Sequence, residues 1–388
     1  MSIRELDQTY VANTYRRFPV EIVSGKGSLV YDTDGREYID MGSGIAVTSF
    51  GVADEIWQRA VIEQIGKVQH TSNLYYTEPC AKLAEALCTR TGMKKVFFSN
   101  SGAEANECMI KAARKWAAEN KGPDCFTIAT LTGSFHGRTV TTLAATGQAH
   151  YHELFQPLTP GFAAVDAGDI AQLDDVNAKT PLAAVMIECI QGEGGVIPLD
   201  PAYAEALSAW TAAHNVLLLV DEVQTGNGRT GALYAYMNYG LTPDAVSTAK
   251  GLAGGLPLGA TMLGERLESV LGYGDHGSTF GGNPVSCAAA LSVLSRIDDD
   301  LLADVRRKSR AVFEALDGAP GVESVSGMGL MIGVRCVKPA AEVVAKCIGR
   351  GVLFLTAKDK VRLLPALNIP DELLIRAADV IKAACAKA

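Results

Sequence analysis

Two side chains that could do chemistry together follow consecutive apolar segments of the chain. Asp221 ends the apolar run Val216–Val220, and Lys250 follows the next such segment, among the small residues of Ser-Thr-Ala-Lys-Gly. A lysine in apolar surroundings loses its proton easily and becomes a nucleophilic amine. A carboxylate at one strand end and such a lysine at the next suit a cofactor with a basic ring nitrogen and an aldehyde. Pyridoxal phosphate is such a cofactor.

Each of these features also has a simpler explanation. An acid at a strand end is commonly a cap or a solvated group, and a lone lysine commonly lies at the surface. The run Gly226–Gly231 also has the GxGxxG spacing of a dinucleotide-binding turn, which would indicate a nicotinamide-dependent oxidoreductase. However, Asp-Glu-Val-Gln would place two charges beside a pyrophosphate, and Asp244 comes too early to serve the ribose. The oxidoreductase is therefore a remote alternative.

A phosphate could be held by the segment around Ser101. Val96–Phe98 is predicted to be a short strand, and Ser101 with Glu104 has the capping-box spacing at the start of a helix that reaches Trp116. The free N–H groups and the positive dipole end of such a helix favour an anion. An ordinary capped helix without a ligand would show the same pattern.

A second loop offers an aromatic ring and a guanidinium. Phe135 and Arg138 follow the predicted strand Cys125–Thr130, on a loop flanked by glycines. The ring could stack on a cofactor and the guanidinium could clamp a carboxylate. A packed phenylalanine and a solvated arginine are the simpler alternative.

The elements that must position these groups alternate between strands and helices. This alternation predicts a three-layer α/β domain rich in parallel strands, and the short elements after about residue 298 predict a smaller α+β domain. We expect an N-terminal arm and hairpin over 1–48, a large domain over 49–297 and a small C-terminal domain over 298–388. Further strands are predicted at Ala183–Ile190 (interrupted by Glu188), Pro257–Leu263, Val322–Ser326, Leu330–Val337, Val352–Leu355 and Val361–Leu364. Further helices are predicted at Glu55–Val68, Glu78–Thr91, Asp200–His214, from Pro284 to about Ile297, at Leu301–Leu316, at Ala340–Arg350 and from Pro370.

Composition restricts the class of protein. The chain has 388 residues, 48% of them hydrophobic, and a formal net charge of −8, which disfavours nucleic acid and anionic membranes as partners. No apolar run approaches the length of a membrane span, and we expect a cytoplasmic protein. The nine cysteines are scattered without CxxC spacing, so neither a metal site nor a disulfide framework is expected.

Longer motifs resemble those of one enzyme family almost from end to end. The chain is similar to the class III (ω-amino acid) aminotransferases, which are pyridoxal-phosphate enzymes of fold type I. The segments from Asn13 to Val20 and from His70 to Pro79 favour the acetylornithine branch of that class. The motifs that carry the resemblance are HTSNLYYTEP, FFSNSGAEANE, SFHGRT, IQGEGG, LLLVDEVQTGNGRTG, STAKGLAGGLPLGA and HGSTFGGNP.

The resemblance implies a role for each residue that meets the cofactor. Lys250 would carry the cofactor covalently and act as the general base, and Asp221 would pair with the ring nitrogen. The remaining cofactor residues would be Ser101, Gly102 and Ala103 at the phosphate, Phe135 stacked on the ring, Gln224 at the phenolic oxygen, Glu188 as a supporting acid, and Thr279 at the phosphate of the neighbouring subunit. Because of Thr279, the resemblance implies a homodimer with shared active sites.

The resemblance also implies the substrates. The reaction would move the δ-amino group of N-acetylornithine to 2-oxoglutarate, giving N-acetylglutamate 5-semialdehyde and glutamate in a ping-pong cycle of arginine biosynthesis. Arg138 would bind the carboxylate of the acetylated donor. Arg362 would bind the α-carboxylate of glutamate or 2-oxoglutarate and would pair with Glu193 while the donor is bound. Ser278 and Tyr15 complete the expected substrate-binding set.

Two departures from the family pattern leave alternatives open. Phe50–Asp54 replaces a common Gly-His-x-His-Pro run, and Asn227 stands where an apolar residue is more usual. Transaminases acting on succinylornithine, acetyl-lysine, ornithine or 4-aminobutyrate would carry much the same cofactor residues. A cofactor-binding protein without catalysis is a further alternative, disfavoured because the set of chemical residues is complete.

Overall fold

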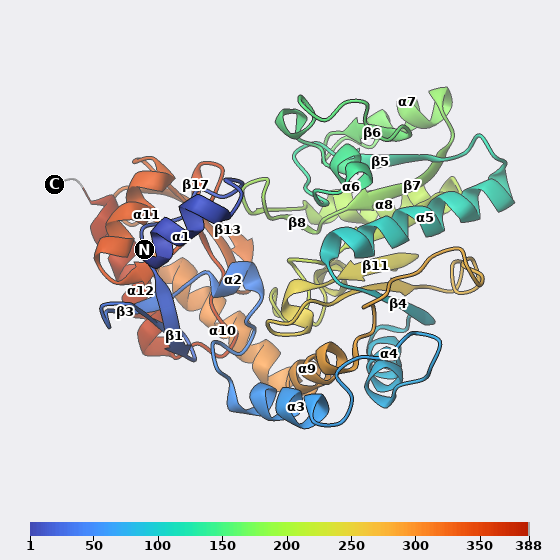
Figure 1. Ribbon diagram of the computed structural model, residues 1–388. Helices are drawn as coiled ribbons and strands as arrows, with labels where there is room; N and C mark the ends of the chain where they lie inside the picture. The colour runs from blue at the N-terminus through green and yellow to red at the C-terminus, as the bar shows by residue number, and fades with distance from the viewer. Residues whose placement is uncertain (387–388) are drawn as a thin grey trace.

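A computed structural model describes residues 1–386, and its largest element is a seven-stranded sheet (Figure 1). The strand order is β4-β12-β11-β10-β7-β5-β6, in which β12 runs antiparallel to both neighbours and the strands from β11 to β6 are parallel. Strands β5, β7 and β10 are buried throughout, as parallel strands covered on both faces must be. The bounds are β4 Lys95–Ser99, β5 Thr127–Leu131, β6 Phe162–Val165, β7 Leu182–Ile187, β10 Leu217–Asp221, β11 Ala245–Thr248 and β12 Gly259–Leu263.

Alternate residues of this sheet pack into different hydrophobic clusters. Leu217 and Leu219 of β10 join the cluster that includes helix α5 (Gly102–Lys121), whereas Leu218 and Val220 join the cluster that includes α8 (Pro201–Ala213). Because successive side chains of a strand point to opposite faces, the two helices cover opposite faces of the sheet. The predicted three-layer α/β domain is confirmed.

Other helices lie around this sheet or lead into it, whereas α1 lies on the smaller lobe at the left of Figure 1. Helices α3 and α4 both contact α9 beside the β4 edge (Figure 1). The bounds are α1 Ile3–Tyr10, α2 Ser43–Ala46, α3 Glu55–Ile65, α4 Glu78–Thr91, α6 Val140–Ala145, α7 Ala171–Lys179 and α9 Pro284–Leu294, with the short strand pair β8 Ile190–Gln191 and β9 Ile197–Pro198.

A second lobe contains both the beginning and the end of the described chain. Its antiparallel sheet β13-β14-β17-β16 is joined by a sheet β1-β2-β3-β15, in which Ile39 of β3 pairs with Val352 of β15. One hydrophobic cluster includes Tyr38 and Ile39 together with Ile332 of β14. The bounds are β1 Ile22–Lys26, β2 Leu29–Asp32, β3 Glu37–Asp40, α10 Asp299–Leu316, β13 Val322–Met328, β14 Met331–Cys336, α11 Ala340–Gly349, β15 Val352–Leu353, β16 Leu355–Ala357, β17 Lys360–Leu363 and α12 Asp371–Cys385.

The division into residues 1–48, 49–297 and 298–388 stays a prediction, and the last two residues of the third range lie outside the described chain. Among the described residues, no helix is both long enough and apolar enough to cross a membrane.

Most predicted elements are present, with shifted ends. Helix α5 continues past Trp116 to Lys121, because Gly122 and Pro123 are the first residues that stop it. The strand predicted over Val352–Leu355 is two short strands that belong to different sheets. Strand β6 and helix α7 were not predicted from the sequence.

Candidate active site

The predicted chemical residues meet at the carboxyl ends of neighbouring parallel strands. Asp221 is the last residue of β10 and pairs in register with Ser247 of β11, which leads directly to Lys250. Open α/β sheets bind ligands at this edge. A cavity of about 570 Å³ lies there, lined by predicted residues from several elements: Tyr15, Ser101, Gly102, Ala103, Phe135, Arg138, Glu188, Asp221, Gln224 and Lys250.

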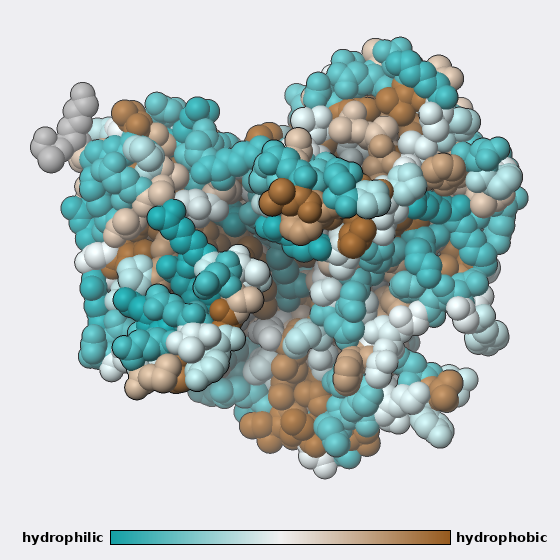
Figure 2. Space-filling view, turned by 45° about the horizontal axis from the view of Figure 1, so that its top comes forward, coloured by the Kyte–Doolittle hydropathy of each residue, from teal (hydrophilic) through white to brown (hydrophobic). Residues whose placement is uncertain are grey.

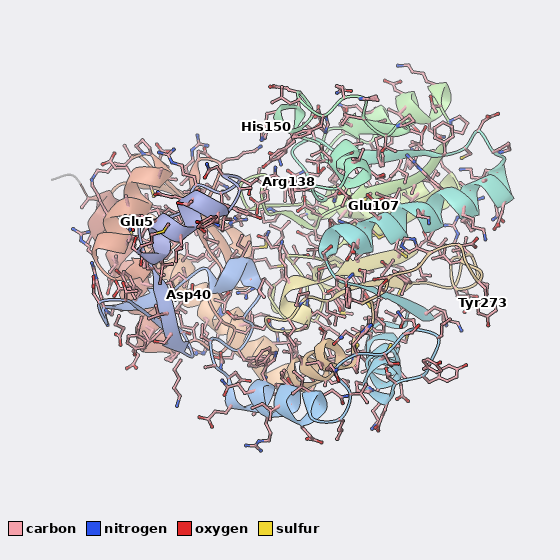
Figure 3. The ribbon with its side chains drawn as sticks, viewed as in Figure 1. Glu5, Asp40, Glu107, Arg138, His150 and Tyr273 are labelled. Carbon is pink, nitrogen blue, oxygen red and sulfur yellow. The ribbon has the colours of Figure 1, made fainter. Side chains whose placement is uncertain are left out.

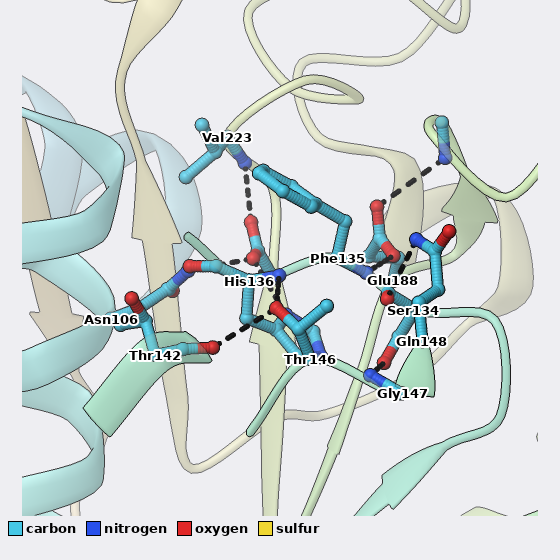
Figure 4. A network of polar contacts seen from close by, with 12 residues as sticks. Asn106, Ser134, Phe135, His136, Thr142, Thr146, Gly147, Gln148, Glu188 and Val223 are labelled. Atoms are coloured by element: carbon cyan, nitrogen blue, oxygen red, sulfur yellow. Dashed lines mark hydrogen bonds and ion pairs between the residues drawn. The ribbon is translucent and has the colours of Figure 1, made fainter. Parts of the chain in front are cut away.

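Three donors, whose residues are labelled in Figure 4, hold the Asp221 carboxylate in place. Its Oδ2 accepts a hydrogen bond from Asn106 Nδ2 at 2.7 Å and lies 2.9 Å from His136 Nδ1, while Oδ1 accepts from the Val223 amide at 3.0 Å. An ionised carboxylate can only accept, so the shared proton lies on Nδ1 of His136. These contacts stabilise a buried negative charge that faces the cavity.

Lys250 is half-buried at the cavity and its backbone is strained. Its φ of 42° lies in the left-handed region, which costs a non-glycine residue about 1–2 kcal/mol. Burial lowers the pKa of the Lys250 amine, although Asp221 and Glu193 oppose this effect. The lysine is therefore prepared to act as a neutral nucleophile or base.

The amino end of α5 lines the cavity. Ser101 caps the helix by accepting a hydrogen bond from the Glu104 amide at 3.2 Å, and Glu104 in turn accepts one from the Asn100 amide at 2.6 Å. The amides of Gly102 and Ala103 belong to the first turn, where a helix has N–H groups without intrahelical partners. A Cβ on Gly102 would lie 2.5 Å from Val223, so the close approach of these two segments requires glycine.

Glu188 supports the loop that carries Phe135. Its carboxylate accepts hydrogen bonds from the Phe135 amide at 2.9 Å and the Gly192 amide at 3.3 Å (Figure 4). Burial raises the pKa of Glu188 to about 7. The carboxylate thus fixes the position of Phe135 at the cavity wall.

An ion pair joins the two lobes beside this cavity. Arg362 of β17 places Nη1 2.5 Å from the Glu193 carboxylate and 3.2 Å from Gln224 Oε1. Burial acts to raise the pKa of Glu193, but the charge of Arg362 and its hydrogen bond outweigh that effect and lower it. The predicted pairing of Glu193 with Arg362 is present in this structure.

Ser278 and Thr279 lie elsewhere. Both line a second cavity together with His70 and Asn73, and Ser278 Oγ accepts a hydrogen bond from Asn100 at 3.1 Å. Within one copy of the chain, the structure does not bring these two residues to the cavity of Lys250.

Sequence reasoning missed the two side chains that support Asp221. Asn106 is the polar exception on a buried helix face that also contains Ala105, Ile110 and Ala113, which was a usable signal. His136 lies within the SFHGRT motif, but only the fold shows that its ring meets Asp221. A single residue's type could not have shown that contact.

Comparison with known proteins agrees with this geometry. A model of the family described as "Aminotransferase class-III" matches residues 10–385. The chain belongs to the class III aminotransferases. It is 50% identical over 381 residues to the acetylornithine aminotransferase of Haemophilus ducreyi, an alignment that covers 98% of this chain and 97% of that protein.

Solved structures of class III aminotransferases have the same fold as this one. The ornithine aminotransferase of Toxoplasma gondii matches with a TM-score of 0.94 and 32% identity, covering 98% of this chain and 93% of its own. The N-acetylornithine aminotransferase of Stenotrophomonas maltophilia matches with a TM-score of 0.84 and 35% identity, covering 98% and 97%. Sequence and structure thus place the chain in one family.

Pyridoxal phosphate, the cofactor of class III aminotransferases, fits the residues present. The cavity offers a half-buried amine with a lowered pKa, a carboxylate held by three donors and the open first turn of a helix. Among the described residues, His136 Nε2 and Asn106 Oδ1 are buried without a partner on the network that supports that carboxylate. Lys250 would carry the aldehyde carbon, Asp221 would face the ring nitrogen, and the α5 amides would face the phosphate.

Proposed function

We propose that this class III aminotransferase moves the δ-amino group of N-acetylornithine to 2-oxoglutarate. The observation that carries the proposal is a pair of arginines with different surroundings. Arg362 is engaged by Glu193, whereas the Arg138 guanidinium contacts aromatic rings and has no carboxylate partner among residues 1–386. One arginine is thus free for the donor's remote carboxylate, and the other becomes free when a dicarboxylate arrives. The name of the Haemophilus ducreyi relative supports the same substrate.

The chain's own groups account for the proton transfers. Pyridoxal phosphate supplies an electron sink for the carbon that carries the amino group. The Asp221 carboxylate would hold a proton at the ring nitrogen, and the Asn106 and His136 donors keep that carboxylate in position. The lowered pKa of Lys250 favours the neutral form of Nζ, which is the form that would take a proton from the substrate carbon.

Free ornithine is a second candidate, favoured by the structural match to an ornithine aminotransferase. An unacylated donor would carry a second ammonium group beside its carboxylate, near the Arg138 guanidinium. Like charges repel, and the described contacts of Arg138 include no acid that would offset the repulsion. Acylation removes that charge, so the surroundings of Arg138 favour an acylated donor.

The test is a comparison of donors with purified, cofactor-loaded enzyme and 2-oxoglutarate. We expect kcat/KM for N-acetylornithine to exceed that for ornithine and 4-aminobutyrate by at least about tenfold, or roughly 1.4 kcal/mol. N-succinylornithine and N-acetyl-lysine test the acyl group and the chain length. Equal or faster turnover of ornithine would overturn the assignment while leaving the cofactor chemistry intact.

A homodimer with shared sites and a cytoplasmic location stay predictions. Support for association comes from exposed apolar side chains, including Ile62 of α3, Leu74 and Phe280. Figure 2 shows apolar residues gathered at the lower edge of one face. Such patches commonly mark interfaces. Because Thr279 lies outside the cavity of its own chain, a second copy would give that residue the role expected from the family.

A further inference from the structure

The Arg138 guanidinium lies against an aromatic ring that the sequence did not single out. Its Cζ is 4.2 Å from the centroid of the Tyr151 ring and 5.5 Å from that of Phe135. The Phe135 and Tyr151 rings meet edge to face, with centroids 5.8 Å apart and planes at 65°. Tyr151 therefore touches both the residue expected against the cofactor ring and the residue expected against the substrate carboxylate.

Among residues 1–386, no hydrogen bond or ion pair fixes the Arg138 side chain, so the ring contacts are what position it. Arg138 is exposed at the cavity, and its described contacts are the two rings. A free arginine samples many rotamers, and binding a carboxylate must then order it. A guanidinium stacked on a ring is already held in one plane, which leaves its N–H groups directed outward from the ring.

Tyr151 is itself anchored. It ends a short 3-10 turn, Ala149–Tyr151, with Gln148 and His152 on either side. Gln148 Nε2 donates to the Ser134 carbonyl at 3.1 Å, and His152 Nε2 lies 2.9 Å from the Leu143 carbonyl. The His150 ring also packs against Tyr151, with centroids 3.9 Å apart and planes tilted by 40°. Figure 3 shows Arg138 and His150 on the side of the large lobe that faces the small lobe. The ring is thus tied to the loop of Phe135 and to α6.

We propose that Tyr151 is a positioning residue for Arg138 and, through it, selects amine donors that carry a carboxylate remote from the reacting amine. This inference rests on the proposed function, since it assumes that Arg138 meets the donor carboxylate. The ring does the positioning, because the described contacts of Tyr151 are made by its face and edge. Phenylalanine should replace it, and a small residue should not.

The experiment compares Tyr151→Ala and Tyr151→Phe with the wild-type holoenzyme on two donors. N-acetylornithine has the remote carboxylate, and butylamine does not. For Tyr151→Ala we expect KM for N-acetylornithine to rise about 3- to 30-fold, the range of a partly exposed cation–π contact, with kcat within about twofold. kcat/KM for butylamine should not change, and Tyr151→Phe should behave as wild type. Tyr273→Ala, a fully exposed tyrosine far from the cavity, is the matched control.

A binding measurement provides a readout without turnover. N-acetylnorvaline keeps the acylated amino-acid end and lacks the reacting amine, so calorimetry reports the carboxylate contact alone. We expect Tyr151→Ala to weaken its binding by the same factor as the rise in KM, while the absorbance of the bound cofactor stays unchanged.

The outcomes separate the two proposals. If the wild-type enzyme binds N-acetylnorvaline and turns over N-acetylornithine, and Tyr151→Ala changes neither, the role of Tyr151 is overturned and the proposed function stands. An equal loss on both donors, or an equal effect of the Phe and Ala variants, would indicate general damage to the loop and would also overturn it. A wild-type enzyme that neither binds N-acetylnorvaline nor accepts N-acetylornithine would overturn both proposals.

Discussion

The Arg362 guanidinium lies 2.5 Å from the Glu193 carboxylate, and this ion pair connects the small-lobe strand β17 to the loop after β8. While the pair is intact, Arg362 is neutralised for any incoming carboxylate. A ping-pong transaminase must accept two dissimilar substrates at one cavity. An arginine that is paired with Glu193 while one substrate is bound, and released from that pair when the other binds, meets this requirement without a second site.

The first prediction follows from that pair. Glu193→Gln should leave Arg362 uncovered, so that L-glutamate becomes a better amine donor relative to N-acetylornithine. We expect the ratio of the two half-reaction rates to shift by about tenfold or more toward glutamate, because a hydrogen bond to a charged group contributes roughly 1.5–3 kcal/mol. Single-turnover absorbance with each donor measures the ratio. An unchanged ratio would show that Glu193 does not control access to Arg362.

The second prediction concerns the support of Asp221. His136→Phe keeps the ring shape and removes the donor that lies 2.9 Å from the carboxylate. A hydrogen bond to a charged group contributes about 1.5–3 kcal/mol, so kcat should fall roughly 10- to 100-fold and the cofactor should dissociate faster. Steady-state assays measure kcat, and dialysis followed by absorbance measures the loss of the cofactor. His214→Phe, which alters a histidine at the end of α8, is the control and should change neither.

The third prediction is a pH dependence of stability in the cofactor-free protein. Burial raises the pKa of Glu222 from 4.5 to about 7. A raised pKa means that folding favours the protonated form of Glu222. The contribution of Glu222 to the free energy of unfolding is therefore greatest below about pH 4.5 and is lost as pH rises through 7. Glu222→Gln keeps the acceptor for the Tyr236 amide and gains a donor for Thr225, without this penalty.

The free energy of unfolding of Glu222→Gln relative to wild type should therefore increase with pH across this window, by at most about 3 kcal/mol. Urea unfolding at several pH values measures it. A difference that stays constant between pH 4.5 and 7 would contradict the buried-acid explanation.

The fourth prediction concerns Asn227, the residue that departs from the family pattern. Its Nδ2 donates to Thr248 Oγ1 at 3.1 Å and to the Ala249 carbonyl at 3.2 Å, directly before Lys250, and its own φ is 58°. Asn227→Leu loses these bonds and places a branched side chain at positive φ. We expect a loss of stability of about 2–4 kcal/mol and slower covalent attachment of the cofactor.

Asn227→Gly separates the two causes, because glycine accepts positive φ but cannot make the bonds. If the bonds position Lys250, the Gly variant should recover part of the stability and keep the slow attachment. Attachment is followed by borohydride trapping and mass measurement. Full recovery by glycine would leave backbone strain as the sole explanation.

The sequence predicted most helices and strands well, because hydrophobic periodicity and the residues at their ends agree in most of these segments. Helix α4 begins and ends where Glu78 and Thr91 were expected, since Pro79 opens it and Gly92 closes it with φ of 77°. Strand β6 was missed because its four residues carry no alternation, and β15 was merged with β16 because Phe354 gives no sign of the change of sheet.

The sequence predicted those residues of the candidate site whose type and neighbours in the chain already indicate their chemistry. Lys250 and Asp221 stand out by type and position, whereas the role of His136 depends on a contact with Asp221 across the sheet edge. Tyr151 gave no signal at all, because its contact with Arg138 exists only once the loop after α6 has folded back. Groups that act through another group are visible only in three dimensions.

The pairing of Ile39 with Val352 affects how the chain can be made. A ribosome adding about 5–20 residues per second would synthesise β3 on the order of tens of seconds before its partner β15. During that time the apolar residues Tyr38 and Ile39 would have no completed cluster to enter. The large sheet between them contains its own core and can form first, so the N-terminal strands must wait for β15 before their own sheet is complete.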